Sequence, residues 1–207
     1  MSCKKRSPKT LRGCGKSRSD SKLENWESVV ADYRKNHYGA LECELEKFAE
    51  VYREKGLEEL VRSAASGKDP ETGERMPHQS SRFSEKTLQC WMEELSGITG
   101  EIGQCRTFEQ LHELLEQKME NIDHIGPLTC YDTAQRIGYA LGFPPRDYVY
   151  LHVGAQLPCE KEQKSGRVAV SELEKSVTEE LSAYHIENML CFYNGRISKS
   201  LRKSGTR

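Results

Sequence analysis

The chain has 207 residues, of which 36% are hydrophobic and 30% charged. This length can bury a sizeable core, and this composition is typical of a soluble helical protein. No apolar run approaches the roughly 20 residues that a membrane-spanning helix needs, so the sequence predicts no membrane partner.

The charges are unevenly distributed along the chain. The formal net charge is −1, but residues 1–24 carry net +6, residues 196–207 carry +5, and the segment between them carries −12. Basic segments of this kind can contact nucleic acid through counterion release, or they can serve only as solubilising ends.

The first residues do not resemble a secretory signal, because no apolar stretch follows the basic ones. We therefore expect a cytoplasmic protein. The eight cysteines show no CxxC pair and no histidines at zinc-finger spacing, so the sequence predicts free thiols, no metal and no cofactor.

The N-terminal part is expected to be a disordered basic tail over residues 1–20, followed by a helix that starts near Ser21. Apolar residues with helical periodicity define its buried face: Trp26, Val29, Val30 and Tyr33. A second helical stretch begins near Ala40, with a possible bend at Gly56.

The segment "SGKDPETGERMPHQSSRF" (66–83) is predicted to be a long surface loop, since it is dense in Gly, Pro, Ser and Asp. Ser84 suits the N-cap of the next helix. Thr107 and Gln110 have capping-box spacing at the start of another helix.

After that helix, Gly126 permits a tight turn and Pro127 suits the first position of a further helix that reaches Leu141. The segment "DYVYLHVGA" fits either a buried strand or a helical turn. A final helix is predicted to follow Ser182.

These patterns predict a mainly α fold: a compact helical bundle with little or no β structure. We expect a single helical domain over residues 21–195, with a hairpin unit at about 107–142, between the basic tail 1–20 and the basic tail 196–207.

The hairpin sequence "IDHIGPLT" (122–129) resembles the "LPGVGPKT" hairpin of the helix-hairpin-helix DNA-binding superfamily, which includes DNA glycosylases. The likeness covers residues 115–142. It is carried by five matching positions: Ile122, Ile125, Gly126, Pro127 and Thr129. His124 replaces the first hairpin glycine, and Asp123 adds a negative charge.

The resemblance implies that the hairpin binds backbone phosphate, because small residues and exposed N–H groups at a helix start let the main chain approach DNA. It also implies a contact by Arg136 on that helix, although Asp132 and Arg136 also form an ordinary i,i+4 pair. The implied contacts are His124, Ile125, Gly126, Leu128, Thr129 and Arg136.

The resemblance extends to enzymes, but Leu128 occupies the position of the glycosylase lysine nucleophile and cannot form a Schiff base. Asp147 is the carboxylate nearest to the expected catalytic aspartate. His152 is a second candidate, although a buried, hydrogen-bonded histidine is the alternative. Whether the protein is an enzyme stays open.

A wider likeness, over residues 75–193, connects the chain to an uncharacterised family of small bacterial proteins. It is carried by "PHQ", "GPLTCYDTAQRIG", "YLHVGA" and "SAYHIENMLCFY". This likeness implies no activity.

The long loop offers a second candidate contact surface, since Arg75, His78 and Arg82 form a locally basic patch in an acidic segment. The leading hypothesis is a non-enzymatic protein that binds DNA, or another nucleic acid, through the hairpin and the basic tails. The alternatives are a protein-interaction module with a purely structural hairpin and a divergent DNA glycosylase or nuclease.

Overall fold

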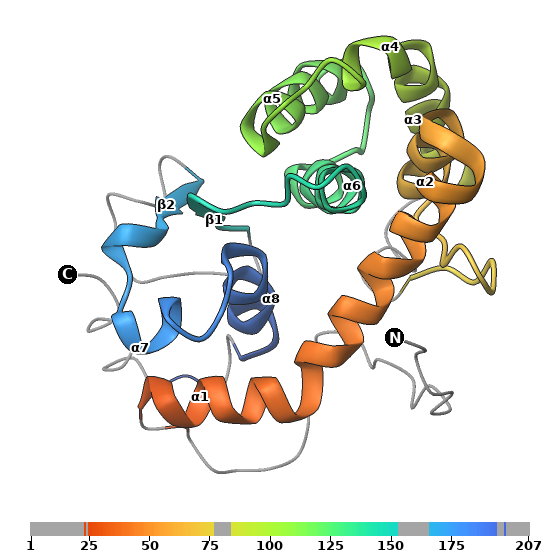
Figure 1. Cartoon of the computed structure of the whole chain (residues 1–207). Helices are drawn as coiled ribbons and strands as arrows, with labels where there is room; N and C mark the ends of the chain where they lie inside the picture. Colours follow the sequence, from red (N-terminus) through yellow and green to blue (C-terminus); the bar gives the residue numbers. More distant parts are fainter. Residues whose placement is uncertain (1–22, 24, 77–83, 153–165, 194–196, 198–207) are drawn as a thin grey trace. The chain divides into compact units, whose positions relative to one another are not determined.

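The computed structural model describes residues 23, 25–76, 84–152, 166–193 and 197. Its fold is mainly α, as the sequence predicts (Figure 1). The helices and strands are, in chain order, α1 (Trp26–Tyr33), a π-helix (Arg34–Tyr38), α2 (Gly39–Ala65), α3 (Glu85–Gly97), α4 (Thr99–Ile102), α5 (Phe108–Met119), α6 (Pro127–Ala140), β1 (Tyr148–Tyr150), β2 (Arg167–Ala169), a 3-10 helix (Val170–Glu172), α7 (Lys175–Thr178) and α8 (Ala183–Tyr193).

Two compact units share the described residues, where the sequence predicted one domain over 21–195. The central unit is continuous and comprises residues 42–142. The terminal unit combines the described residues up to Leu41 with those from Phe143 onward. The predicted tails 1–20 and 196–207 lie outside the described residues, apart from Ile197.

Helix α1 of the terminal unit begins at Trp26, later than the predicted start near Ser21. The side chain of Asn25 caps it by accepting a hydrogen bond of 2.8 Å from the Ser28 amide. Its predicted apolar face is buried, as the periodicity indicated: Trp26, Val29, Val30 and Tyr33.

The core of the terminal unit forms between α1, α8 and a short two-stranded sheet. Strands β1 and β2 are antiparallel, with Val149 paired to Val168. The extended segment around Tyr148 is therefore a strand rather than a helical turn. Buried apolar residues of the cluster include Val149, Val168, Leu173, Val177, Leu181, Ile186, Met189 and Leu190.

Leu23 and Ile197 lie side by side at the edge of this core. They form an isolated parallel β-bridge, and the Ile197 amide donates a 2.9 Å hydrogen bond to the carbonyl of Tyr193 in α8. Ile197 is buried and Leu23 packs against the same cluster.

The central unit starts in the long helix α2, which bends where the sequence suggested it. Gly56 has φ +82, outside the helical region, and only glycine adopts this conformation without strain. Farther along, Ser84 caps α3 and Thr107 caps α5, as predicted. The capping box of α5 is incomplete, because Gln110 accepts from the Arg106 amide (2.8 Å) rather than from Thr107.

Helices α5 and α6 pack against each other and carry the hairpin between them, and α3 also packs on α5. Trp91 of α3 is fully buried and donates a 3.2 Å hydrogen bond from its indole nitrogen to Thr133 of α6. This contact fixes α6, whose first residues form one side of the hairpin, against the core of the unit.

Candidate nucleic-acid interface

The turn between α5 and α6 is short and anchored by one apolar side chain. The amide of Ile122 donates to the carbonyl of Met119 (3.0 Å), and the amide of Ile125 donates to that of Ile122 (3.4 Å). Ile125 is buried, so its side chain fixes the turn to the core and cannot itself contact a ligand on the surface.

His124 lies exposed at the tip of this turn in a left-handed conformation, with φ +71. Among the described residues, no other non-glycine residue has a positive φ. The helix-hairpin-helix pattern has its first glycine at this position, and glycine is the residue that adopts such a φ most readily. The backbone of this chain is thus left-handed at this position, although the residue there is histidine.

Helix α6 begins directly after the turn with an open N-terminus. Gly126 is the N-cap and has extended backbone, no side chain caps the helix, and Pro127 occupies its first turn. A Cβ atom added at Gly126 would meet nothing within 4 Å. Bulk around this position therefore does not prevent another molecule from approaching the main chain.

The amides of Leu128 and Thr129 belong to the first turn of α6, where N–H groups have no partner within the helix. The helix dipole adds a partial positive charge there. The side chain of Thr129 is buried. At Thr129, therefore, only the backbone amide can bind a ligand.

Two acidic side chains flank the hairpin. Glu120, just after α5, and Asp123, beside the tip, are both exposed. Their carboxylates oppose the approach of a phosphate, and the effect weakens with added salt.

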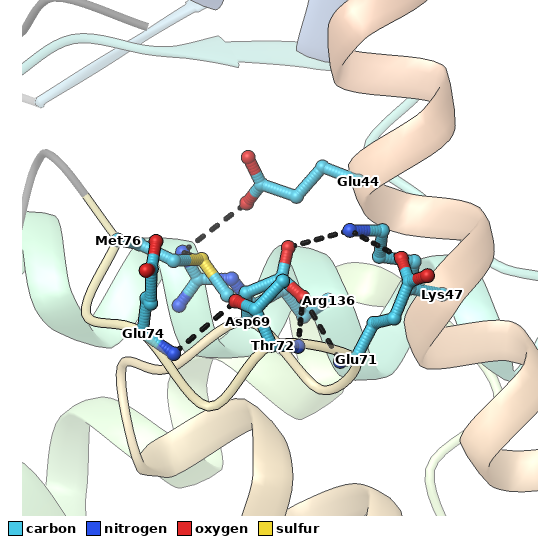
Figure 2. Close-up of polar contacts among 8 residues, drawn as sticks. All are labelled: Glu44, Lys47, Asp69, Glu71, Thr72, Glu74, Met76 and Arg136. Atoms are coloured by element: carbon cyan, nitrogen blue, oxygen red, sulfur yellow. Dashed lines mark hydrogen bonds and ion pairs between the residues drawn. The ribbon is translucent and has the colours of Figure 1, made fainter. Parts of the chain in front are cut away.

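Arg136 does not belong to the surface on which the sequence placed it. Its side chain is buried, with only 3% of the residue exposed. The guanidinium lies 3.4 Å from a carboxylate oxygen of Glu44 and 3.0 Å from the sulfur of Met76 (Figure 2). It also lies 3.4 Å from the carbonyl of Ala64. The predicted phosphate contact by Arg136 is therefore wrong, because a ligand on the surface cannot reach a buried guanidinium.

The turn around Asp69 belongs to the predicted long loop and is drawn in the same figure. Asp69 accepts hydrogen bonds from the amides of Glu71 (2.9 Å) and Thr72 (3.1 Å), and Lys47 of α2 lies 2.6 Å from its other oxygen (Figure 2). Burial alone would raise the pKa of Asp69, but these hydrogen bonds outweigh it and lower the pKa below 3.8. The turn is thus closed on itself and tied to α2.

The second candidate surface is only partly described. Arg75 lies 2.8 Å from Glu85 of α3, and Lys68 lies 3.7 Å from the same residue. Much of the positive charge of Arg75 is therefore balanced locally. His78 and Arg82 lie outside the described residues.

The candidate catalytic residues belong to the terminal unit, whereas the hairpin belongs to the central unit. Asp147 is exposed at the start of β1, and His152 is half-buried just beyond it. The two candidates therefore flank strand β1, one on each side of it along the chain.

Burial lowers the pKa of His152 to about 4. The imidazole is neutral at physiological pH as a result. It therefore brings no positive charge to a phosphate.

The sequence did not predict a polar and aromatic cluster within the terminal unit. The hydroxyl of Tyr33 and Nδ1 of His185 are 2.8 Å apart, both side chains are fully buried, and Tyr38 stacks on the imidazole with ring centroids 3.8 Å apart. Tyr38 belongs to the π-helix, whose wider turn changes which side chains face α8. Helical periodicity gave no signal for this cluster, since the pattern of apolar residues assumes 3.6 residues per turn.

Within the described ranges, no three His, Cys, Asp or Glu side chains lie close enough to hold a metal ion. In the same ranges, no helix is both long and apolar enough to cross a membrane. The cysteines that the structure describes are free thiols: Cys43, Cys90, Cys105, Cys130 and Cys191.

We also compared the sequence with protein-family models, with curated proteins and with solved structures. None of the three comparisons found a match.

Proposed function

We propose that this protein associates with nucleic acid, as a binding protein rather than an enzyme, and holds backbone phosphate at the hairpin between α5 and α6. The observation that carries the proposal is the left-handed His124 followed by the open start of α6 at Gly126. Together they support a main-chain contact with phosphate at this turn.

The chemistry of this contact rests on main-chain groups. The amides of Leu128 and Thr129 donate to a phosphate oxygen, and the N-terminal dipole of α6 favours its negative charge. The imidazole of His124 is the one hairpin side chain that can add a hydrogen bond. Contacts of this kind hold a backbone without reading its sequence.

Positive charge elsewhere in the chain offsets the negative charges of Glu120 and Asp123. The segments 1–24 and 196–207 carry net +6 and +5, and long-range attraction by such segments needs no fixed geometry. The proposal therefore expects affinity that falls steeply as salt is added.

The protein-interaction alternative receives less support. It expects an exposed apolar patch. Within the described residues, Tyr52 is the one large hydrophobic residue that counts as exposed, at 37%. The glycosylase or nuclease alternative uses Asp147 or His152 and requires a cleft that joins them to the hairpin, and no observation on the described residues favours it.

The test is fluorescence anisotropy with labelled duplex and single-stranded DNA at two salt concentrations. Gly126→Glu places a carboxylate where the phosphate would bind, and it fits because the added side chain meets open space. We expect the affinity to fall about tenfold or more, since charge-assisted hydrogen bonds contribute about 1.5–3 kcal/mol.

Gly100→Glu is the matched control, since Gly100 is exposed in α4 and an added Cβ there also meets nothing within 4 Å. Asp123→Asn should strengthen binding, because it removes a repelling charge beside the tip. Equal affinities of Gly126→Glu and Gly100→Glu would refute the hairpin contact. Binding that is absent, or insensitive to salt, in the intact chain would refute the association itself.

A further inference from the structure

The buried guanidinium of Arg136 is short of strong hydrogen-bond acceptors. Among the described residues, its polar contacts are a carboxylate oxygen of Glu44 at 3.4 Å, the carbonyl of Ala64 at 3.4 Å and the sulfur of Met76 at 3.0 Å. Charge-assisted hydrogen bonds to oxygen are normally about 2.7–2.9 Å long, so both oxygen contacts are weak. The shortest contact is to a thioether, which is itself a weak acceptor. A stronger acceptor at the place of the sulfur would therefore stabilise this cation.

Met76 is held at this position by its own backbone. Its amide donates a 2.9 Å hydrogen bond to the carbonyl of Gly67, and the neighbouring Arg75 forms an isolated antiparallel bridge with Lys68. These contacts close the turn that follows α2, and the Met76 side chain extends from it to the guanidinium of Arg136 (Figure 2). Met76 is buried, with 5% of the residue exposed. The sulfur atom thus lies at a fixed place beside a buried positive charge.

We propose that Met76 is an oxidation site and that the guanidinium of Arg136 binds its sulfoxide. The oxidant is hydrogen peroxide. A lone pair of the sulfur attacks one peroxide oxygen, the O–O bond breaks, and the proton of the transferred hydroxyl passes to the departing hydroxide, which leaves as water. The thioether is oxidised to the sulfoxide, the peroxide is reduced, and methionine sulfoxide reductases reverse the change. This inference does not rest on the proposed association with nucleic acid.

The added oxygen enters where the guanidinium lacks an acceptor. It is bonded to the sulfur atom, which already lies 3.0 Å from a guanidinium nitrogen, so a small rotation of the Met76 side chain brings it within hydrogen-bond distance. Its hydrogen bond to a cation is charge-assisted. Oxidation of a buried methionine normally disrupts a core, because it adds a polar group that has no partner. Here Arg136 is the partner, so oxidation strengthens the contact between the turn and α6.

Peroxide reaches Met76 through local opening of the turn, without unfolding of the central unit. The ion pairs that hold the turn are partly or largely exposed to solvent: Lys47 with Asp69 and Glu71, and Glu85 with Lys68 and Arg75. Such pairs contribute little individually, and loops open at a lower free energy than the whole fold. Met189 of α8 is the contrasting case, since it is fully buried in an apolar core.

The first measurement is the rate of oxidation in the full-length protein. Met92 and Met119 are replaced by leucine in the reference protein, because both are only half-buried and would also be oxidised. After treatment with hydrogen peroxide, mass spectrometry of peptides compares the oxidation of Met76 with that of Met189. We expect Met76 to be oxidised about tenfold faster or more, since it requires only local opening.

The second measurement is the stability of the same protein before and after oxidation. Thermal unfolding is followed by the fluorescence of Trp91, in a Trp26→Phe background so that the central unit alone reports. We expect the unfolding midpoint to rise by about 4 °C when Met76 is oxidised. Met76→Leu is the matched control, because it has no sulfur to oxidise, and peroxide should leave its midpoint unchanged.

Met76→Gln tests the acceptor without any oxidation. Its amide oxygen lies near the place of the sulfoxide oxygen, so its unfolding midpoint should exceed that of Met76→Leu by about 4 °C. The inference is overturned if oxidation of Met76 lowers the midpoint or leaves it unchanged. It is also overturned if Met76 is oxidised no faster than Met189, or if Met76→Gln is no more stable than Met76→Leu.

Discussion

The guanidinium of Arg136 and the carboxylate of Glu44 meet 3.4 Å apart, although 92 positions separate them in the sequence. The contact joins α6 to α2 within the central unit. Arg136 is buried, and Phe48 lies against the guanidinium with its ring centroid 5.5 Å away. The positive charge is thus held inside the central unit by one carboxylate and a few weaker acceptors.

Glu44→Ala should lower the free energy of unfolding by about 3 kcal/mol, because it leaves a buried cation without its counter-charge. Urea titration followed by the fluorescence of Trp91 measures this, in a Trp26→Phe background so that the central unit alone reports. Glu50→Ala, at an exposed position of the same helix, should change stability by less than about 0.5 kcal/mol. Equal effects of the two substitutions would show that the ion pair contributes nothing.

A second prediction concerns the tip of the hairpin. Because His124 has φ +71, His124→Gly should be more stable than His124→Ala by about 1 kcal/mol, since an L-residue loses roughly that much in the left-handed region. At position 100, in α4, the order should be reversed, with Gly100→Ala more stable than the parent. Thermal unfolding of these proteins tests the predicted order of stability at both positions. If alanine is better than glycine at 124 as well, the turn is not left-handed in solution.

The pairing of Asp69 with Lys47 predicts a dependence on acid. The pKa of Asp69 is lower in the folded protein than its usual 3.8, so its carboxylate stabilises the fold above about pH 4, and this contribution is lost as the pH falls through the lowered pKa. Asp69→Asn keeps an oxygen for the amides of Glu71 and Thr72 but loses the ion pair.

The stability difference between the parent and Asp69→Asn should therefore be full near neutral pH and shrink below about pH 4. Urea titrations at several pH values measure it. Asp123→Asn, at an exposed carboxylate, serves as the control. A difference that stays constant down to pH 2 would contradict the assignment.

His152 predicts a loss of stability of the same sign, but at higher pH. Burial lowers the pKa of its imidazole from 6.5 to about 4, so between these values the unfolded chain takes up a proton that the folded protein does not. The free energy of unfolding should fall as the pH drops from 6.5 towards 4, and His152→Gln should remove that part of the slope. NMR titration of the His152 ring measures the pKa directly, and a value near 6.5 would disprove the burial effect.

Local signals in the sequence predicted much of the fold. The apolar face of α1, the caps at Ser84 and Thr107, the bend at Gly56 and the start of α6 at Pro127 all follow from residues within one or two turns of each other. Such features depend on backbone preference and helical periodicity, which a single sequence carries.

Long-range pairing was not predictable in this way. The i,i+4 spacing of Asp132 and Arg136 suggested a surface pair, whereas the guanidinium binds Glu44, which no local pattern connects to it. The left-handed turn at His124 was equally hidden, since the residue there is not glycine. For the hairpin, the sequence located the turn between the two helices but not which side chains are exposed on it.

Among the described residues, the central unit is one stretch of chain, while the terminal unit is assembled from the segments on either side of it. Domains generally fold as units during synthesis, and residues 42–142 are complete before the terminal unit is. The apolar face of helix α1 is covered only after β1, β2 and α8 have been synthesised. Until then, Trp26, Val29 and Val30 remain without the partners that bury them, so the nascent chain exposes this apolar face for as long as the last third of the protein takes to be made.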